Sequence, residues 1–194
     1  MPKVSLRRQA RALREALPPD QRAARSAAIR QQVLELPELA RARSVFIYIS
    51  AGSEVDTHVL IEALLARNLC VSVPLIVGRG VMEAHRIRGL HEVTPGPYGI
   101  LAPAKPNLMS QPPDVSIVPA LALTRRGDRL GAGGGYYDRY LTNHPQTLAI
   151  ALCFDVQLVD DLPVAGHDQR VDLIVTESGL IRCNRAVSPG PRTA

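Results

Sequence analysis

The sequence predicts an α/β fold built on a parallel sheet, and three observations lead to this prediction. Apolar runs typical of buried strands alternate with segments of helical periodicity, beginning with a strand, a helix and a strand within residues 44–76. Such a unit joins two parallel strands of one sheet. The chain has 194 residues and is 46% apolar, which suits one globular domain with a full core. Because no linker or internal repeat divides it, we predict one domain over residues 1–185 and a disordered tail over residues 186–194.

Two helices are predicted before the first strand. The first carries four apolar residues at helical spacing, which predict one buried stripe, and a basic stripe beside it. The apolar residues are Leu6, Ala10, Leu13 and Leu17, and the basic residues are Lys3, Arg7, Arg11 and Arg14. Pro18 and Pro19 end this helix. The second helix begins near Asp20, whose carboxylate suits the helix dipole, and ends at Pro37.

Short apolar runs rich in β-branched residues predict the strands that follow. They are residues 44–49, 69–76, 115–118, 148–152 and 172–176, with a further candidate at 81–87. Between the first two lies a helix capped by Asp56 or Thr57 and broken at Asn68. Residues 95–113 hold six of the sixteen prolines, which argues against regular structure there. Such a loop is either functional or a plain surface connection, and composition favours neither.

The net charge of +5 is concentrated at the start of the chain. Residues 1–43 contain ten Lys or Arg and four Asp or Glu, whereas residues 44–194 contain thirteen basic and fourteen acidic residues. A basic segment can attract a nucleotide phosphate, a polyglutamate tail or a nucleic acid. A solvated helix face is the simpler interpretation, and composition alone favours it. Since residues 1–43 contain no aromatic side chain for base stacking, we expect no nucleic-acid partner.

The cysteines and the hydropathy pattern indicate the compartment. Cys70, Cys153 and Cys183 are scattered and form no C-x-x-C pair, so they fit reduced core thiols better than a metal site or a disulfide framework. No apolar stretch is long enough to span a bilayer, and no apolar segment typical of a secretory signal follows the basic N-terminus. We therefore expect a cytoplasmic protein that does not enter a membrane.

The segment RLGAGGGYYDR, residues 129–139, has the composition of a phosphate site. Its glycines permit positive φ and leave backbone N–H groups uncovered, and the helix predicted from Tyr136 adds a partial positive charge at its N-terminus. Arg129 and Arg139 flank the turn, and Asp138 could hold a metal ion beside the phosphate oxygens. A flexible glycine turn without a ligand is the alternative.

Two familiar nucleotide motifs do not fit this segment. A P-loop requires Gly-Lys followed by Ser or Thr, but Gly135 is followed by Tyr136. The dinucleotide motif G-x-G-x-x-G also fails, because Tyr136 occupies its last position when Gly131 is the first. A nucleotide site here would therefore be of another kind.

The longer run GDRLGAGGGYYDR, residues 127–139, resembles the signature of the 5-formyltetrahydrofolate cyclo-ligases, also called methenyltetrahydrofolate synthetases. The preceding VPALA at residues 118–122 is similar to the strand end that precedes this signature. The other landmarks, in order, are Lys3 and Arg7, Glu54, Leu101-Ala102-Pro103, Gln157, Leu162-Pro163, His167-Asp168 and Val171-Asp172. Together they cover roughly residues 3–180, and several ordered landmarks are far more specific than any single one.

The resemblance implies a three-layer α/β/α sandwich around a mainly parallel sheet, and an ATP-dependent enzyme. The implied reaction converts 5-formyltetrahydrofolate to 5,10-methenyltetrahydrofolate with release of ADP and phosphate, in the presence of Mg²⁺. Such a reaction depends on charge neutralisation and in-line positioning more than on a protein nucleophile. The chain offers no obvious Ser-His-Asp or Cys-His constellation, which agrees with that. The implied partners are small molecules, a reduced folate and ATP, and we expect a monomer.

The resemblance also implies roles for individual residues. The implied catalytic residues are Arg7, Glu54 and Tyr136. ATP contacts are implied for Lys3, Arg7, Arg129, Leu130, Gly131, Ala132, Gly133, Gly134, Gly135, Tyr136 and Tyr137. Folate contacts are implied for Ile49, Glu54, Gly133, Gly134 and Tyr136, and Mg²⁺ ligation for Asp138 and Asp168.

Four positions depart from the family pattern, and two other functions remain as alternatives. Ala102 replaces Glu or Gln, Leu123 replaces Phe, Thr124 replaces Asp, and Ala132 occupies a position that is Arg in some members. The first three are expected to alter the folate pocket, whereas the glycine turn is retained. One alternative function is an isomerase or transferase of the same fold that holds a sugar phosphate in this turn. The other is a non-catalytic paralogue that binds nucleic acid through its basic helices.

Overall fold

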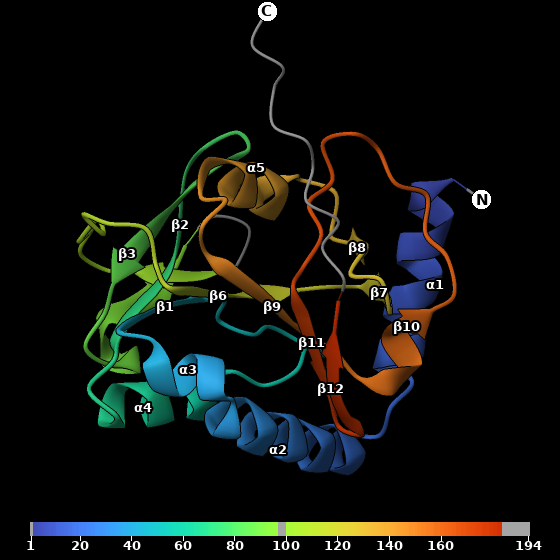
Figure 1. Cartoon of the computed structure of the whole chain (residues 1–194), viewed down its shortest axis with the longest axis horizontal. Coiled ribbons are helices and arrows are strands. Elements are labelled where there is room, and N and C mark those ends of the chain that lie inside the picture. The colour runs from blue at the N-terminus through green and yellow to red at the C-terminus, as the bar shows by residue number, and fades with distance from the viewer. Residues whose placement is uncertain (1, 97–99, 184–194) are drawn as a thin grey trace, which may run out of the picture.

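A computed structural model describes residues 2–96 and 100–183, so the tail predicted at residues 186–194 lies outside the described residues. The helices are α1 Lys3–Glu15, α2 Pro19–Glu35, α3 Pro37–Arg41, α4 His58–Ala66 and α5 Tyr136–Asn143, with short 3-10 helices η1 Leu90–Glu92 and η3 Asp155–Gln157. In Figure 1, α2, α3 and α4 cover one face of the central sheet and α5 covers the other, while α1 lies beside it. The predicted α/β/α sandwich is confirmed. None of the helices in the described ranges is long and apolar enough to cross a bilayer.

The central sheet has seven strands in the order β12-β11-β9-β6-β1-β2-β3. In chain order they are β1 Ser44–Ile47, β2 Cys70–Gly78, β3 Val81–Arg86, β6 Val115–Pro119, β9 Leu148–Leu152, β11 Leu173–Thr176 and β12 Gly179–Arg182. Its five inner strands are parallel, whereas β3 and β12 pair antiparallel at the two edges. The mainly parallel sheet predicted from the βαβ unit is therefore confirmed.

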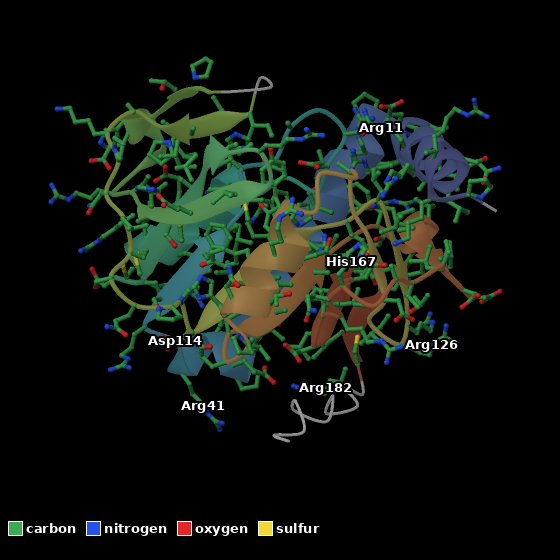
Figure 2. All side chains as sticks on the ribbon, turned by 90° about the horizontal axis from the view of Figure 1, so that it is seen from above. Arg11, Arg41, Asp114, Arg126, His167 and Arg182 are labelled. Carbon is green, nitrogen blue, oxygen red and sulfur yellow. The ribbon has the colours of Figure 1, made fainter. Side chains whose placement is uncertain are left out.

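The strand order reverses at β1, which pairs with β2 on one side and with β6 on the other. Ligands of open α/β sheets bind outside the carboxyl ends of the strands at such a switch point. The amino ends of the strands lie at the opposite edge of the sheet. There Asp114, just before β6, accepts a hydrogen bond from the backbone N–H of Ser44 at 3.0 Å. Figure 2 shows Asp114 well apart from Arg11 of α1.

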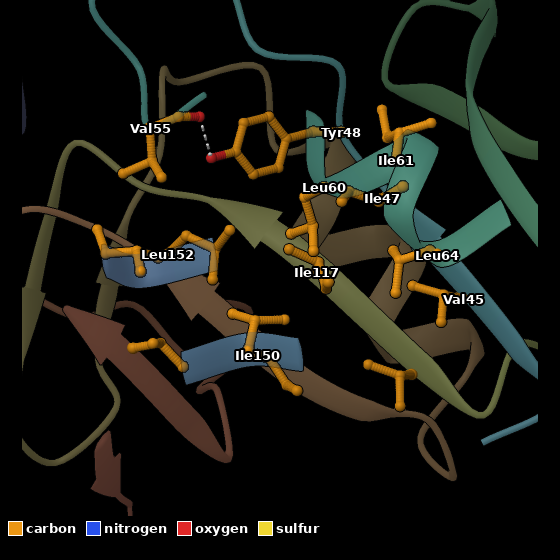
Figure 3. Packing of buried hydrophobic residues seen from close by; sticks show 14 of the residues in the cluster. Val45, Ile47, Tyr48, Val55, Leu60, Ile61, Leu64, Ile117, Ile150 and Leu152 are labelled. Atoms are coloured by element: carbon orange, nitrogen blue, oxygen red, sulfur yellow. Dashed lines mark hydrogen bonds between the residues drawn. The ribbon is translucent and has the colours of Figure 1, made fainter. Parts of the chain in front are cut away.

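The main core fills the space between the sheet and the helices α2, α3 and α4. Leu60, Ile61 and Leu64 of α4 are fully buried in this core, and Leu60 and Leu64 point toward the strands in Figure 3. The strand residues of the same cluster labelled in that view are Val45, Ile47, Ile117, Ile150 and Leu152. Tyr48 follows β1, and its hydroxyl donates to the carbonyl of Val55 at 3.1 Å. This bond fixes the segment after β1, which forms part of the site described below.

Helix α1 differs from its predicted packing by one position. Leu13 is 54% exposed, whereas Arg14 is buried. The helix packs mainly through Ala10, with Leu6 at the margin, against a small apolar cluster formed by Leu121, Ala122, Leu130 and Leu162. This contact turns the basic stripe inward and leaves Leu13 in solvent. The predicted four-residue apolar stripe was therefore wrong at Leu13.

Two further predictions need correction. Pro37 follows the end of α2 and is also the first residue of α3, a position where the missing N–H is tolerated. The proline-rich segment also contains regular structure, an antiparallel pair of β4 Val93–Pro95 and β5 Leu101–Pro103. Proline is compatible with the ends of such edge strands. A second small sheet, formed by β7 Ala122–Thr124, β8 Arg129–Leu130 and β10 Leu158–Val159, was not predicted, and β8 leads directly into the glycine turn.

Candidate active site

A cavity of about 520 Å³ opens at the carboxyl ends of β1 and β6. Helix α1 forms one wall, the segments after β1 and β6 form the floor, and the glycine turn closes another side. The lining includes every residue that the sequence assigned to the site. These are Lys3, Arg7, Ile49, Glu54, Arg129, Leu130, Gly131, Ala132, Gly133, Gly134, Gly135, Tyr136, Tyr137, Asp138 and Asp168. Residues up to 165 positions apart in the chain thus meet at the switch point.

The glycine turn adopts conformations that require glycine. Gly133 has φ +109° and Gly135, the N-cap of α5, has φ +66°, a region that side chains rarely enter. A Cβ on Gly133 would lie 3.2 Å from Cζ of Arg7. Arg7 itself donates from Nε to the carbonyl of Gly131 at 2.9 Å. The turn is therefore a defined structure held against α1, and its N–H groups lie beside the N-terminus of α5.

Arg129 is a buried cation between the glycine turn and the floor. Its side chain is 2% exposed, and Nη2 donates to Oδ1 of Asp138 at 2.8 Å while Nη1 donates to the carbonyl of Pro119 at 3.3 Å. Its guanidinium also lies 5.8 Å from the ring centroid of Tyr137. Nε is buried and has no partner among the described residues. Since buried N–H groups are rarely left unpaired, this atom is suited to an anionic ligand.

Lys3 and Asp168 form an ion pair that joins α1 to the segment after β10. The same carboxylate oxygen, Oδ2, accepts the N–H of Ala165 at 2.7 Å. Burial alone would raise the pKa of Asp168, but the ammonium of Lys3 and this N–H outweigh it and hold the pKa below its ordinary value. Asp168 is therefore ionised at neutral pH and lies at the cavity.

The donor set at Asp138 and Asp168 fits a magnesium ion that also binds phosphate oxygens. The described residues contain no cluster of three or more metal-ligating side chains. Magnesium, however, is usually held by one or two carboxylates together with substrate phosphates and waters. The hydrogen bonds to Asp138 converge on Oδ1, from Arg129 and from the N–H of Gln169 at 3.2 Å, and those to Asp168 converge on Oδ2. Oδ1 of Asp168 has a more distant neighbour, Nε2 of His167 at 3.8 Å, so each carboxylate keeps one oxygen that accepts no hydrogen bond from the described residues.

Glu54 occupies the other end of the cavity, after β1. Its Oε2 accepts the N–H of Ala51 at 3.0 Å, and its Oε1 lies 3.8 Å from Nη1 of the buried Arg14. Arg14 is held in place by a bond from Nε to the hydroxyl of Ser53 at 3.0 Å. Burial raises the pKa of Glu54, and the N–H of Ala51 and the charge of Arg14 offset this only in part.

Glu54→Gln is therefore expected to raise the unfolding temperature at about pH 7 while it slows turnover. Because the folded-state pKa lies above the ordinary value of 4.5, ionisation of Glu54 destabilises the fold once the pH exceeds that value. The gain in unfolding temperature should be small near pH 4 and should grow as the pH rises. Thermal unfolding at several pH values measures it, with Glu15→Gln, an exposed carboxylate of α1, as the control. A lower unfolding temperature at pH 7 would contradict this expectation.

Several lining residues were not assigned from the sequence. Arg11 and Arg14 line the cavity together with Lys3 and Arg7, so the whole basic stripe of α1 faces the site. Their helical spacing was the signal that could have identified them. The apolar residues among them are Tyr48, Pro74, Ile76, Met82 and Ile100. These belong to ordinary strands and loops, and no local pattern distinguished them.

Three of the four departures from the family pattern lie away from the cavity. Ala102, Leu123 and Thr124 are buried and do not line it, whereas Ala132 does. The hydroxyl of Thr124 donates to Oδ2 of Asp128 at 2.8 Å, within the hairpin of β7 and β8. None of these three side chains lines the cavity, so the structure does not support the expectation that they alter the folate pocket by direct contact.

Comparisons with known proteins agree with this geometry. Residues 1–177 match the sequence profile of the 5-formyltetrahydrofolate cyclo-ligase family. The chain is 31% identical over 172 residues to the Escherichia coli (strain K12) protein named 5-formyltetrahydrofolate cyclo-ligase, covering 85% of this chain and 94% of that protein. It is also 31% identical over 204 residues to the Saccharomyces cerevisiae protein of that name, covering 92% and 97%. The solved structure of Aquifex aeolicus 5,10-methenyltetrahydrofolate synthetase superposes with a TM-score of 0.84 at 27% identity, with full coverage of both chains.

Proposed function

Because the chain belongs to the 5-formyltetrahydrofolate cyclo-ligase family, we propose that it converts 5-formyltetrahydrofolate to 5,10-methenyltetrahydrofolate and splits ATP to ADP and phosphate. The observation that carries this proposal is the division of one cavity into two ends. Near the start of α1, Lys3 pairs with Asp168 and Arg7 bonds to the glycine turn, and with Arg129 they form the cationic end. Further along α1, Arg14 lies 3.8 Å from Glu54, which with Ile49 forms the other end. We further propose that the enzyme acts as a monomer in the cytoplasm.

The cationic end suits the phosphates of ATP. The N–H groups of the turn and the N-terminus of α5 supply dipoles, and Lys3, Arg7 and Arg129 supply full charges. Magnesium held by Asp138 and Asp168 would neutralise phosphate charge and orient the γ-phosphoryl group. The buried Nε of Arg129 would gain the acceptor that the described residues do not provide.

The other end suits a reduced folate. Ile49, Ile76 and Met82 offer apolar surface to a flat heterocycle, and Glu54 offers carboxylate oxygens to its N–H groups. The raised pKa of Glu54 indicates a carboxylate that is poorly solvated before substrate binds. Hydrogen bonds from a ligand would restore the solvation that burial removes.

With both substrates bound, the chemistry requires positioning more than a protein nucleophile. The formyl oxygen attacks the γ-phosphorus, and ADP leaves. The folate N10 then attacks the phosphorylated formyl carbon, N10 loses its proton, and the formyl oxygen departs within phosphate as the ring closes. Arg7 and Arg129 lie at the proposed phosphate end of this path, and Tyr136 lines the cavity as the first residue of α5. Their role is to stabilise the charge that moves from the γ-phosphoryl group to the leaving oxygens.

Lys3→Ala is expected to raise the KM for ATP about 10-fold and to change the KM for the folate much less. The reason is that Lys3 belongs to the cationic end, where it reaches Asp168. Steady-state kinetics with each substrate varied in turn measures this, and Arg8→Ala, an exposed cation of α1 outside the lining, is the matched control. An unchanged KM for ATP would return Lys3 to the role of a solvated N-terminal lysine.

The basic stripe also bears on the alternative functions. Lys3, Arg7, Arg11 and Arg14 all line the cavity, which supports a small anionic ligand over a nucleic acid. A sugar-phosphate isomerase or transferase would also use the glycine turn, but it would not consume ATP.

The test of the proposed function is phosphate release from ATP, measured with and without 5-formyltetrahydrofolate. We expect release only when ATP, Mg²⁺ and the folate are all present. Turnover of a sugar phosphate without nucleotide consumption would overturn the proposal.

A further inference from the structure

Arg139 joins two parts of the molecule that are 54 residues apart in the chain, the turn at Gly80 and the turn at Gly134. It lies in the first turn of α5, and its Nε donates to the carbonyl of Gly80 at 2.6 Å. Its Nη2 donates to the carbonyl of Gly134. Arg139 does not line the cavity, and the proposed reaction makes no use of it.

Both turns are shaped to accept this guanidinium. Gly80 has φ +75°, and a Cβ placed there would lie 2.1 Å from Nη2 of Arg139. Gly135 has φ +66°, and a Cβ there would lie 3.0 Å from Nη1. The guanidinium also lies 6.0 Å from the ring centroid of Tyr136. Three glycines and an aromatic ring thus lie against one arginine, which holds two defined hydrogen bonds although its side chain is exposed.

The two turns are adjacent in space but continue into different parts of the cavity lining. Gly80 connects β2 to β3, and these strands supply Pro74, Ile76 and Met82 to the cavity lining. Gly134 belongs to the cationic end. Hydrogen bonds from a cation to both carbonyls therefore tie the wall proposed for the folate to the turn proposed for ATP, from outside the cavity. These hydrogen bonds also restrict the conformations of the glycine-rich turn. Less conformational entropy is then lost when a ligand binds.

We propose that Arg139 is a positioning residue that pre-orders the glycine turn and couples it to the β2–β3 hairpin. Its effect on catalysis rests on the proposed function, whereas its effect on the turn does not. Without Arg139 the turn should open more often and bind a nucleotide less tightly, while the reacting groups stay in place once both substrates are bound.

The test compares variants that break the link made by Arg139, here called the strap, at Arg139 itself or at Gly80. Arg139→Met keeps the length of the side chain but removes its donors, Arg139→Lys keeps the charge, and Gly80→Ala displaces the guanidinium from the hairpin side. The controls are Gly78→Ala, in the same hairpin, where a Cβ would meet only ordinary contacts at 3.8 Å, and Gly179→Ala, where alanine meets the strain of a positive φ, +153°, in open space. Two readouts are measured on the full chain, amide hydrogen exchange of residues 131–139 without ligand and the KM for ATP.

We expect Arg139→Met to speed exchange of residues 131–139 about 5-fold and to raise the KM for ATP about 5-fold, with kcat within about 2-fold of wild type. Arg139→Lys should recover part of both effects, and the variant combining Arg139→Met with Gly80→Ala should be no worse than the stronger single variant. Gly78→Ala and Gly179→Ala should change neither. Unaltered exchange in Arg139→Met, or additive effects in the combined variant, would overturn the proposal. If the wild type proves not to turn over, the proposed function fails, and the exchange measurement still decides whether the strap exists.

Discussion

Asp138→Asn is expected to lower kcat about 10³-fold while the protein stays folded. The carboxylate lines the cavity, and in the function that we propose the neutralisation of phosphate charge depends on a cation held by Asp138 and Asp168. An amide oxygen can still accept from Arg129 and from the N–H of Gln169, so the local structure is preserved. The variant loses only the charge that faces the buried guanidinium, which should cost about 2 kcal/mol of stability.

Single-turnover kinetics at saturating substrates and thermal unfolding together measure this prediction. The control is Asp161→Asn, a carboxylate that is 81% exposed, and it should change neither quantity. Full activity of Asp138→Asn would remove Asp138 from the mechanism. Loss of folding in place of loss of turnover would show that Asp138 serves to hold Arg129 and not a cation.

Gly133→Ala is expected to weaken nucleotide binding about 100-fold, the second large effect. Alanine is strained at φ +109°, and its Cβ would press on the guanidinium of Arg7 at 3.2 Å. The turn would have to relax, and Arg7 would lose its bond to the carbonyl of Gly131. Both changes act on the wall that we propose for the phosphates.

Calorimetric titration with ADP measures this change in affinity without turnover. Gly166→Ala is the matched control, because it lies between the lining residues Ala165 and His167 and a Cβ there would have open space. We expect its affinity for ADP to equal that of the wild type. Unchanged affinity in Gly133→Ala would contradict a phosphate role for the turn.

The sequence predicted the sheet because its signal is local. The inner strands are continuous apolar runs, as expected for strands covered on both faces, and each run appears where a parallel strand lies. The same reasoning failed for α1, where an arginine and not a leucine is buried. Periodicity identifies two stripes on a helix, but only the tertiary neighbours decide which stripe faces inward.

The site was predicted as a set of residues, but its electrostatics were not. The glycine run and its flanking charges stand close together in the sequence, so their chemistry could be inferred. The pairings of Arg129 with Asp138 and of Lys3 with Asp168 depend on how β8, α5 and the segment after β10 meet. Contacts between elements distant in the chain leave no local pattern. The small sheet of β7, β8 and β10 was missed for a related reason, since its strands are only two or three residues long.

The most direct test of the proposed function is the absorbance of the methenyl product formed from 5-formyltetrahydrofolate and Mg-ATP at near-neutral to mildly acidic pH. Controls omit the folate, ATP or Mg²⁺ in turn. We predict a rise in absorbance that requires all three and that is lost in Asp138→Asn but retained in Asp161→Asn. The contradicting result is no rise from folded wild-type protein that still binds ADP, which would leave the nucleotide site in place and remove the folate as its substrate.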